Sequence, residues 1–489
     1  MIDIQKSTYP LDDKIKRIFP KESLYKDPDF YNVFHSYNLP SFIKDWLIRI
    51  FTLGNEFDRQ TCREFLSEKV PNRGVSLRQK LLHLRKPIQI LSRLIIHTDL
   101  MNGRISFSIP DLGIGHREGL VSLDMEQEKL NLLHEGEVWG ILTLVYVPPT
   151  EYMPGHILLI DYKPFQPYSL DPAYFYEARR HFTTHEWIDL IVRTMEFNPH
   201  YVDEKQGKYF DLKRKMALIS RLLVYTETNL NMIELAPKGT GKSYVFNNLS
   251  KYNWTVSGGV ITRANLFYNI STRLPGIIHH YDFLVLDEIE TLGFSNEEET
   301  LGAFKNYLEN GKIVVANYTG RSDCGLMMLG NIRLDKRMRP RNKNFFIGLP
   351  QFFQSSAFVD RIHGFIEGWD LFRFNENMKM KGISLNTEYF SEMLHLMRHE
   401  HQYTAIVDEM LEIPKSADTR DTKAVKKLCS AYLKLIFPHI TKPNDVSPLE
   451  LELYVLKPAL QKRAVIRQQL SELDPEYSPE IPDIRLRRY

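Results

Sequence analysis

The chain has 489 residues, 43% of them hydrophobic and 25% charged, which is typical of a water-soluble protein with roughly two to four domains. No apolar run of about 18 residues occurs, and the first residues lack the apolar core of a signal peptide; we therefore expect a cytoplasmic protein without a membrane span. The formal net charge of +2 does not by itself indicate nucleic-acid binding, so any basic surface has to be local.

Residues 1–85 are predicted to form an N-terminal helical region. Ser41 is a suitable N-cap, and it precedes apolar residues at helical spacing. Residues 62–85 are rich in arginine and lysine, and two interpretations stay open: a basic helical pair that contacts DNA, or a solvated surface. The apolar residues after Ser41 are Phe42, Ile43, Trp46, Leu47 and Ile50.

The pattern changes to alternating apolar and polar residues in residues 86–168. Turn signals such as Asn102-Gly103 and Pro148-Pro149 separate five short β-rich runs. Five strands in so short a segment fit a small barrel, either an oligonucleotide-binding (OB) barrel or another small β-domain. The predicted strands cover residues 94–97, 104–109, 119–125, 139–147 and 156–162.

Residues 169–230 are predicted to form a helical connector. Thr183 and Glu186 have the spacing of a capping box, which predicts a helix start at this point. Asn198-Pro199 ends that helix, and a second amphipathic helix over residues 210–225 leads into the next strand.

Residues 231–243 combine a short apolar strand, a glycine-bearing turn and the start of a helix. Glycines let backbone N–H groups converge on a phosphate, Lys242 supplies a mobile positive charge, and the Ser243 hydroxyl can bind Mg²⁺. Ala236 stands where the phosphate-loop pattern has its first glycine, and a small residue is tolerated there. The predicted nucleotide-binding residues are Pro237, Lys238, Gly239, Thr240, Gly241, Lys242 and Ser243.

The second half of this site is predicted in residues 281–288, an apolar run that ends in Asp287 and Glu288. Such a run is typical of a buried parallel strand with its polar end at the carboxyl edge of a sheet. We expect Asp287 to bind Mg²⁺ opposite Ser243, and Glu288 to orient and deprotonate the attacking water. A core strand that happens to end in acids is the alternative, but the two halves occur in the right order. Together they predict a nucleoside triphosphatase.

Apolar strands alternate with helices through residues 231–370, the pattern of a parallel α/β core. The two apolar halves of residues 312–331 flank residues 319–323, which predicts a hairpin followed by a core strand. Asn331 ends that strand near the expected γ-phosphate, where it either positions the attacking water or simply forms a turn. Residues 333–343 carry six basic side chains, which are either solvated or line a nucleic-acid channel.

Residues 371–440 are predicted to form a helical lid, and residues 441–489 a C-terminal tail. His395, His399 and His401 have the spacing of residues that share a helix face, but no HExxH pattern accompanies them. A solvated helix is therefore favoured over a zinc site. The three cysteines are isolated in the sequence, so neither a disulfide framework nor a cysteine zinc site is predicted.

Four segments carry a resemblance to a known family: residues 182–191 (FTTHEWIDLI), 233–243 (IELAPKGTGKS), 257–269 (SGGVITRANLFYN) and 357–369 (AFVDRIHGFIEGW). Together they resemble the BrxL family, the Lon-related AAA+ proteins of bacterial BREX phage-defence systems. The resemblance implies a multidomain α/β plus β fold. In it, an AAA+ P-loop ATPase core with a helical lid follows an N-terminal helical region and a small OB-like DNA-binding barrel. It also implies ATP and Mg²⁺ as cofactors, a homo-oligomeric, hexameric ring, double-stranded DNA as a partner, and contacts with other phage-defence proteins.

The resemblance also implies roles for single residues at the nucleotide site. Lys242 and Ser243 match Walker A, Asp287 and Glu288 match Walker B, and Asn331 matches the sensor 1 residue.

Further residues match elements outside the phosphate loop. Arg361 matches the arginine finger, which implies active sites at subunit boundaries, because a guanidinium can stabilise charge on a neighbour's γ-phosphate. Lys423 falls where a sensor 2 residue lies. The hairpin resembles a pore hairpin, with Asn317, Tyr318 and Arg321 as candidate DNA contacts.

Usual members of the family continue into a Lon-type protease domain with a Ser–Lys dyad, whereas about fifty residues follow the predicted lid here; we expect no proteolysis. The predicted function is a ring-forming ATPase that moves on DNA or remodels it in phage defence. Two alternatives stay open: a protein-remodelling ATPase, and a DNA-binding scaffold whose assembly ATP controls. The polar hairpin with Arg321 favours DNA over polypeptide.

Overall fold

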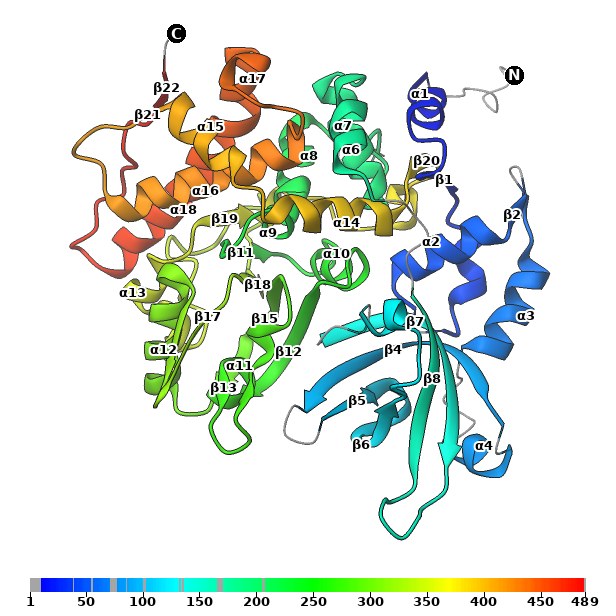
Figure 1. The fold of residues 1–489 in the computed structure, drawn as a ribbon. Coiled ribbons are helices and arrows are strands. Elements are labelled where there is room, and N and C mark those ends of the chain that lie inside the picture. The colour runs from blue at the N-terminus through cyan, green and yellow to red at the C-terminus, as the bar shows by residue number, and fades with distance from the viewer. Residues whose placement is uncertain are drawn as a thin grey trace. The chain divides into compact units, whose positions relative to one another are not determined.

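The structure is a computed structural model in which the chain folds into two compact units (Figure 1). The first unit contains the residues up to Asp27 and those from Leu170 onward, and the second begins at Pro28. The predicted N-terminal region, residues 1–85, is therefore divided between the two units. The structure describes residues 10–37, 39–53, 56–70, 77–84, 86–99, 103–131, 133, 136–164, 170–204 and 207–487.

Helices form the early part of the second unit, as the periodicity of its apolar residues predicts. The N-cap of α2 (Ser41–Ile50) is Pro40, one residue before the predicted position. α3 (Arg59–Lys69) is capped by the Asp58 carboxylate, which accepts two backbone N–H hydrogen bonds. α4 (Leu77–Leu84) follows.

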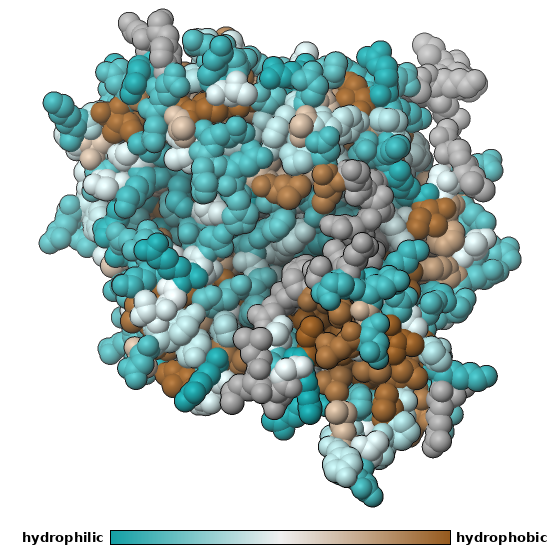
Figure 2. Space-filling view, in the orientation of Figure 1, coloured by the Kyte–Doolittle hydropathy of each residue, from teal (hydrophilic) through white to brown (hydrophobic). Residues whose placement is uncertain are grey.

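Five strands of the second unit close into a barrel in the order β4-β5-β6-β8-β7, which confirms the predicted five-stranded barrel. β6 and β8 pair in parallel, and all other neighbours are antiparallel. Gly140 allows two strands to approach closely, because a Cβ atom there would lie 2.5 Å from the Lys163 carbonyl oxygen. Figure 2 shows hydrophobic residues gathered over the barrel strands. The strands are β4 (Ile88–Asp99), β5 (Arg104–Ile109), β6 (Ile114–Val121), β7 (Gly136–Val147) and β8 (His156–Pro164).

A five-stranded parallel sheet forms the centre of the first unit, in the order β12-β15-β18-β11-β19 (Figure 1). All residues of β11 are buried, as expected for a strand covered on both faces. Since β11 lies between β18 and β19, its carboxyl end is flanked by the ends of both neighbours. The predicted parallel α/β core is thus confirmed. Its strands are β11 (Asn231–Ala236), β12 (Asn253–Ile261), β15 (Phe283–Phe294), β18 (Gly325–Asn331) and β19 (Gly364–Glu367).

Helices from distant parts of the chain share one hydrophobic core with this sheet. α12 (Glu297–Asn310), α13 (Ser356–Val359) and α18 (Lys457–Leu473) all contribute buried residues to it. The predicted tail, residues 441–489, therefore includes a helix of the sheet's own core. Arg463 of α18 is fully buried and donates a hydrogen bond of 2.6 Å to the Asp421 carboxylate.

A hairpin precedes β18, as the sequence predicts. β16 (Lys312–Val315) pairs with β17 (Tyr318–Arg321), so the turn lies at residues 316–317 and not at the predicted residues 319–323. Ala316 has a φ of 50°, because a two-residue hairpin turn needs left-handed backbone. The predicted turn segment is mostly strand, since its residues pair back onto β16.

The connector before the sheet is helical, and its predicted capping box is confirmed: the Thr183 side chain accepts the Glu186 N–H, and the Glu186 carboxylate accepts the Thr183 N–H. A 3₁₀ turn divides the predicted second helix over residues 210–225. The helices are α6 (Pro172–Arg180), α7 (Thr184–Thr194), α8 (Leu212–Ile219) and α9 (Leu223–Thr226).

The remaining helices include α14 (Thr387–Arg398), α15 (Gln402–Met410) and α16 (Thr419–Ile436). Just before α14, β20 (Gly382–Leu385) pairs antiparallel with β1 (Ser23–Lys26), which is how the start of the chain joins this unit. In the part of the chain that the structure describes, no helix is both long and apolar enough to cross a membrane.

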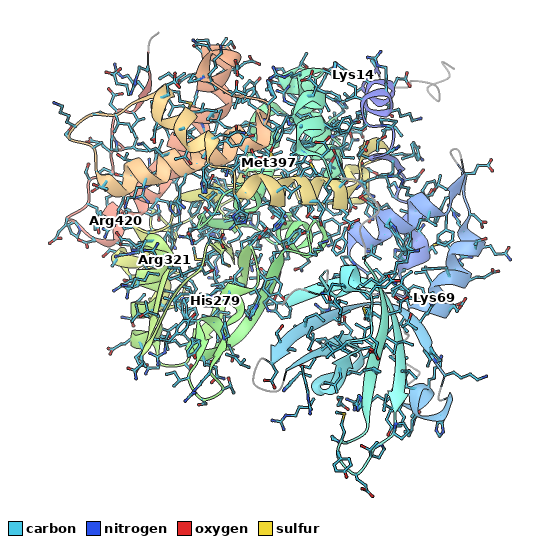
Figure 3. The ribbon with its side chains drawn as sticks, in the orientation of Figure 1. Lys14, Lys69, His279, Arg321, Met397 and Arg420 are labelled. Carbon is cyan, nitrogen blue, oxygen red and sulfur yellow. The ribbon has the colours of Figure 1, made fainter. Side chains whose placement is uncertain are left out.

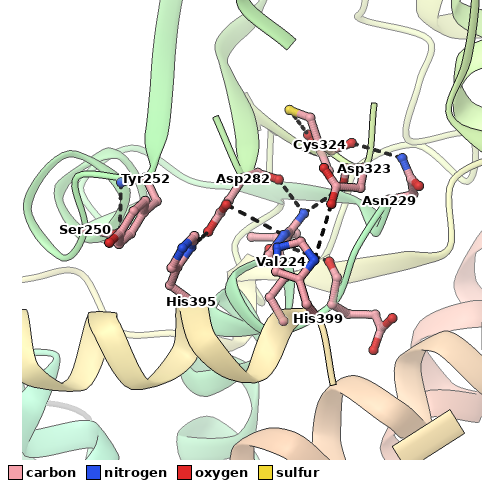
Figure 4. Close-up of polar contacts among 12 residues, drawn as sticks. Val224, Asn229, Ser250, Tyr252, Asp282, Asp323, Cys324, His395 and His399 are labelled. Atoms are coloured by element: carbon pink, nitrogen blue, oxygen red, sulfur yellow. Dashed lines mark hydrogen bonds and ion pairs between the residues drawn. The ribbon is translucent and has the colours of Figure 1, made fainter. Parts of the chain in front are cut away.

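The solvated helix predicted around His395 is wrong for α14, where ten of the 12 residues are buried. Nδ1 of His395 lies 2.7 Å from the Asp282 carboxylate, and its ring stacks on Tyr252 with centroids 3.8 Å apart (Figure 4). Arg398 donates to main-chain carbonyl groups, including that of Val224 at 2.7 Å. α14 therefore lies against the amino ends of the strands in the sheet. The described residues hold no cluster of three or more metal-ligating side chains.

Candidate functional site

The turn between β11 and α10 (Lys242–Asn248) has the backbone of a phosphate loop. Gly239 and Gly241 have φ angles of 84° and 71°, in the left-handed region that favours glycine. The space beside Gly239 is open, since nothing lies within 4 Å of the position that a Cβ atom would take. Ala236 fits in place of the usual glycine because it faces Gly368, where a Cβ atom would lie 2.4 Å from the Ala236 Cβ.

Donors elsewhere in the unit bind the carbonyl groups of this loop. The Phe374 backbone N–H donates to the Gly239 carbonyl at 2.7 Å, and two Arg221 nitrogens donate to the Thr240 carbonyl at 3.2 Å each. In a trans peptide, the C=O and the following N–H point in opposite directions. The N–H groups of Thr240 and Gly241 therefore point away from these donors, as a phosphate cradle requires.

Lys242 reaches across to the end of the neighbouring strand. Its Nζ donates to Oδ1 of Asn331 at 2.9 Å, because the parallel register pairs the last residue of β11 with Asn331. Burial lowers the pKa of the Lys242 ammonium, and nearby carboxylates oppose that shift. The structure thus brings the predicted sensor residue to the loop lysine. The opposing carboxylates are those of Glu234, Asp287 and Glu290.

Asp287 and Glu288 lie where β15 departs from regular pairing. The Asp287 side chain is 6% exposed, and it accepts the Glu288 backbone N–H at 2.9 Å. Regular pairing with β12 resumes only at Leu292. Glu288 itself is exposed and has a φ of 54°, a strained backbone for a residue other than glycine. A buried carboxylate beside an exposed one suits a metal ligand and a base.

Glu290 is an acidic residue of the site that was not predicted from the sequence. Its carboxylate accepts a hydrogen bond of 3.3 Å from the backbone N–H of Asn331, and another from the Asn331 Nδ2. Because a carboxylate only accepts, the amide oxygen of Asn331 is turned toward Lys242. No sequence pattern singled it out, because β15 is irregular between Asp287 and Leu292 and the alternation of strand faces does not hold there.

Arg361 does not contact the phosphate loop of its own chain among its observed hydrogen bonds and ion pairs. Its guanidinium pairs with Glu309 of α12 at 2.8 Å and donates to the Ala357 carbonyl at 2.6 Å. Arg420 pairs with the same Glu309 at 3.5 Å and with Asp360 at 2.6 Å. Arg361 thus belongs to a charged cluster before β19.

Lys423 is exposed on α16, one turn from Lys427. The Lys427 ammonium donates to the carbonyl groups of Thr228 and Asn229 at 2.6 and 3.3 Å. Those residues precede β11, whereas the phosphate loop follows it. The structure therefore places Lys423 toward the opposite edge of the sheet, and does not bring it to the phosphate loop of its own chain as a sensor 2 residue.

The three candidate DNA contacts differ in their surroundings. Asn317 and Arg321 are exposed on the hairpin, and Arg321 is labelled in Figure 3. Tyr318 is partly buried, and its ring stacks on Tyr268 of β13 (Tyr268–Asn269) with centroids 3.8 Å apart. Tyr318 therefore joins two hairpins, while Asn317 and Arg321 present their side chains to solvent.

These residues fit a nucleotide with its Mg²⁺ ion. The loop N–H groups and Lys242 are suited to the phosphates. The Ser243 hydroxyl, in the first turn of α10, and the Asp287 carboxylate are oxygen ligands of the kind Mg²⁺ prefers.

Comparison with known proteins matches two family models. Residues 157–482 match "Lon-like protease BrxL-like, ATPase domain", and residues 17–146 match "BREX system Lon protease-like protein BrxL N-terminal". The first match contains the phosphate loop, the two acids and Asn331.

Two curated relatives are both named Lon-like protease BrxL. The chain is 24% identical over 444 residues to the protein of Escherichia coli O9:H4 (strain HS), covering 89% of this chain and 61% of the relative. It is 27% identical over 348 residues to the protein of Bacillus cereus (strain H3081.97), covering 71% of this chain and 49% of the relative. The chain thus spans about half to three fifths of the length of these relatives. Since the ATPase-domain model alone matches well over half of the chain, the protein belongs to the BrxL family.

Proposed function

We propose that the protein is an AAA+ ATPase that assembles into a hexameric ring and binds or encircles double-stranded DNA. In this proposal, it couples ATP hydrolysis to DNA translocation or remodelling in BREX-type phage defence, together with other defence proteins. One observation carries the ATPase part: the loop with Lys242, which follows β11, lies at the same edge of the sheet as Asn331 of β18 and the Asp287–Glu288 pair of β15.

Each of these residues has a chemical role in the proposal. The loop N–H groups and Lys242 bind the phosphates, and Mg²⁺, held through Ser243 and Asp287, supplies neutralisation of their charge. Glu288 accepts a proton from the attacking water. Asn331 contacts Lys242 in this structure. Once the phosphates attract Lys242, the Asn331 oxygen can accept a hydrogen bond from the water and orient it.

The proposed ring gives Arg361 its role. A guanidinium near a γ-phosphate stabilises the charge that spreads over the phosphate oxygens during transfer. Arg361 pairs with Glu309 in its own chain, so it would exchange this partner for the phosphate of a neighbouring subunit. ATP binding and ring assembly are then linked, because each site needs residues of two subunits.

Two features support DNA as the partner. The barrel order, with β6 and β8 parallel, suits the five-stranded Greek-key OB barrel, which binds oligonucleotides in other proteins. The loop after β18 exposes six basic side chains. Asp335 lies within this loop, and its carboxylate accepts hydrogen bonds from the backbone N–H groups of Arg337 and Arg339. This loop therefore presents mainly positive charge. The basic residues are Arg333, Lys336, Arg337, Arg339, Arg341 and Lys343.

A second candidate is an ATPase that remodels polypeptides. It is favoured by apolar side chains exposed on the hairpins: Ile270 is 52% exposed, Leu274 57% and Val314 39%. Exposed apolar side chains bind unfolded polypeptide better than they bind a phosphate backbone.

ATPase rates measured with no additive, with double-stranded DNA, and with an unfolded protein distinguish these functions. Stimulation by DNA that weakens steeply with salt would support the DNA motor, since phosphate contacts release counterions. Arg321→Ala should lower this stimulation, while Lys305→Ala, a partly exposed cation of α12, serves as the control. Stimulation by unfolded protein alone would favour polypeptide remodelling. Stimulation by neither would leave the ATP-controlled DNA scaffold.

A further inference from the structure

We propose that a buried ion pair beneath the phosphate loop, Arg221 with Glu234, orients the loop backbone and so sets its affinity for a nucleoside triphosphate. The inference rests on the proposed function, because it takes this loop to be the nucleotide site. Both are positioning residues, since Arg221 acts through the loop backbone and Glu234 acts through Arg221.

Glu234 is the one charged residue of β11, a strand whose other side chains are apolar except for Asn231. Glu234 and Arg221 are both 0% exposed. The guanidinium binds the carboxylate through two hydrogen bonds, Nε to Oε2 at 2.9 Å and Nη2 to Oε1 at 2.7 Å. Gly368 leaves room for this carboxylate, because a Cβ atom there would lie 2.7 Å from Oε1. The two planar groups are therefore held in a bidentate arrangement.

The same guanidinium also binds the loop. Nη1 and Nη2 of Arg221 both donate to the Thr240 carbonyl at 3.2 Å. Glu234 holds the guanidinium in place, so the position of the Thr240 carbonyl is determined from the strand below it. Since the next N–H points the opposite way in a trans peptide, Arg221 also determines the direction of the Gly241 N–H.

A purely stabilising role does not explain this pair. Replacing a buried ion pair with apolar residues of similar volume is often neutral or stabilising, because desolvation of the charges offsets their attraction. An apolar pair could fill the space between β11 and the preceding helical segment, but it could not donate to the Thr240 carbonyl. The contact that needs the charges is the one with the loop. Without it, ATP binding has to order the loop backbone, which weakens affinity.

The test replaces both partners at once, in the double variant Arg221→Met with Glu234→Leu. The double variant leaves no unpaired buried charge but removes the donors of the Thr240 carbonyl, so it is expected to fold with a melting temperature slightly below that of the wild type. The dissociation constant for MgATP, measured by calorimetry, should rise at least about tenfold, equivalent to about 1.4 kcal/mol. In steady-state assays, KM for ATP should rise more than kcat falls, because the loop's preference for the bound conformation is lost.

The matched control is Arg463→Met with Asp421→Leu. Arg463 is also buried, donates to the Asp421 carboxylate at 2.6 Å, and binds a main-chain carbonyl, that of Ile362, at 2.6 Å. Its further partner, Asp360 at 3.0 Å, keeps the ion pair with Arg420 in the control. The Ile362 carbonyl precedes β19 and is not part of the phosphate loop. The control should therefore bind MgATP with the affinity of the wild type.

Unchanged MgATP affinity in a folded Arg221/Glu234 double variant would overturn the inference, as would an equal loss in the control. If the double variant fails to fold, Arg221→Gln with Glu234→Gln keeps a polar pair but shortens the donor, and the same affinity loss is expected. Failure of the proposed function gives a different result: the wild type itself would not bind MgATP, or Lys242→Ala would bind it as tightly as the wild type.

Discussion

Glu290→Gln tests how the orientation of Asn331 contributes to hydrolysis. The Glu290 carboxylate accepts two hydrogen bonds from Asn331, one from its backbone N–H and one from its side chain. A glutamine has nearly the same shape, but one of its two terminal groups is a donor. The glutamine oxygen can accept a hydrogen bond from only one of the two Asn331 donors. The glutamine NH₂ group then faces the other donor, which is left without an acceptor.

The expected loss follows from this geometry. A hydrogen bond to a charged acceptor contributes about 1.5–3 kcal/mol, and each 1.36 kcal/mol in the activation free energy changes the rate tenfold. If all of this lost hydrogen-bond free energy is added to the activation free energy of hydrolysis, kcat should fall by about 10- to 150-fold. ATP affinity should change by less than about threefold, because Glu290 donates nothing to the phosphates and Lys242 keeps its own position in the loop.

The assay is kcat at saturating MgATP together with the MgATP dissociation constant, with Glu298→Gln as the control. Glu298 lies exposed in the first turn of α12, and its substitution should change neither quantity. A Glu290→Gln variant with kcat within threefold of the wild type would show that the orientation of Asn331 does not matter. Equal losses in affinity and kcat would show that Glu290 acts on binding.

Three further substitutions address the remaining roles. Lys242→Ala should abolish MgATP binding in calorimetry, since the loop loses the ammonium that lies beside Asn331 and Asp287; retained affinity would mean that this loop does not hold the phosphates. Glu288→Gln should bind MgATP but hydrolyse it about 10²- to 10⁴-fold more slowly in single-turnover assays, and normal turnover would place the base elsewhere. Arg361→Ala should be inactive alone, yet regain activity when mixed with Glu288→Gln subunits, because some interfaces then combine an intact finger with an intact base. Absence of rescue at every mixing ratio would contradict shared sites.

The chemical groups of the site could be predicted because each lies within one short segment. The phosphate loop is encoded in residues 231–243, where strand, glycines and lysine follow one another. Asp287 and Asn331 both end apolar runs, and parallel strands bring their carboxyl ends to the same edge of a sheet. The barrel strands could be predicted for the same reason, because their alternation of apolar and polar residues is a local pattern.

The contacts that orient these groups could not be predicted in the same way. Glu290 and Asn331 are 41 residues apart, and the Phe374 N–H that binds the Gly239 carbonyl comes from a loop after β19. His395 was expected in a solvated helix, because helical spacing does not reveal that Asp282, 113 residues earlier, lies beneath it. The family resemblance suggested sensor 2 for Lys423, whereas α16 packs at the amino edge of the sheet.

The sequence by itself determined that this chain carries a phosphate loop, two acids at a strand end, an asparagine at the end of a further strand and a small β-domain of five strands. These features depend on the order and periodicity of nearby residues. Only the tertiary structure decided which way the loop peptides face, which end of the Asn331 amide meets Lys242, and which helices complete the core. Those outcomes depend on hydrogen bonds and packing between elements far apart in the chain, and their geometry is set only when the elements come together.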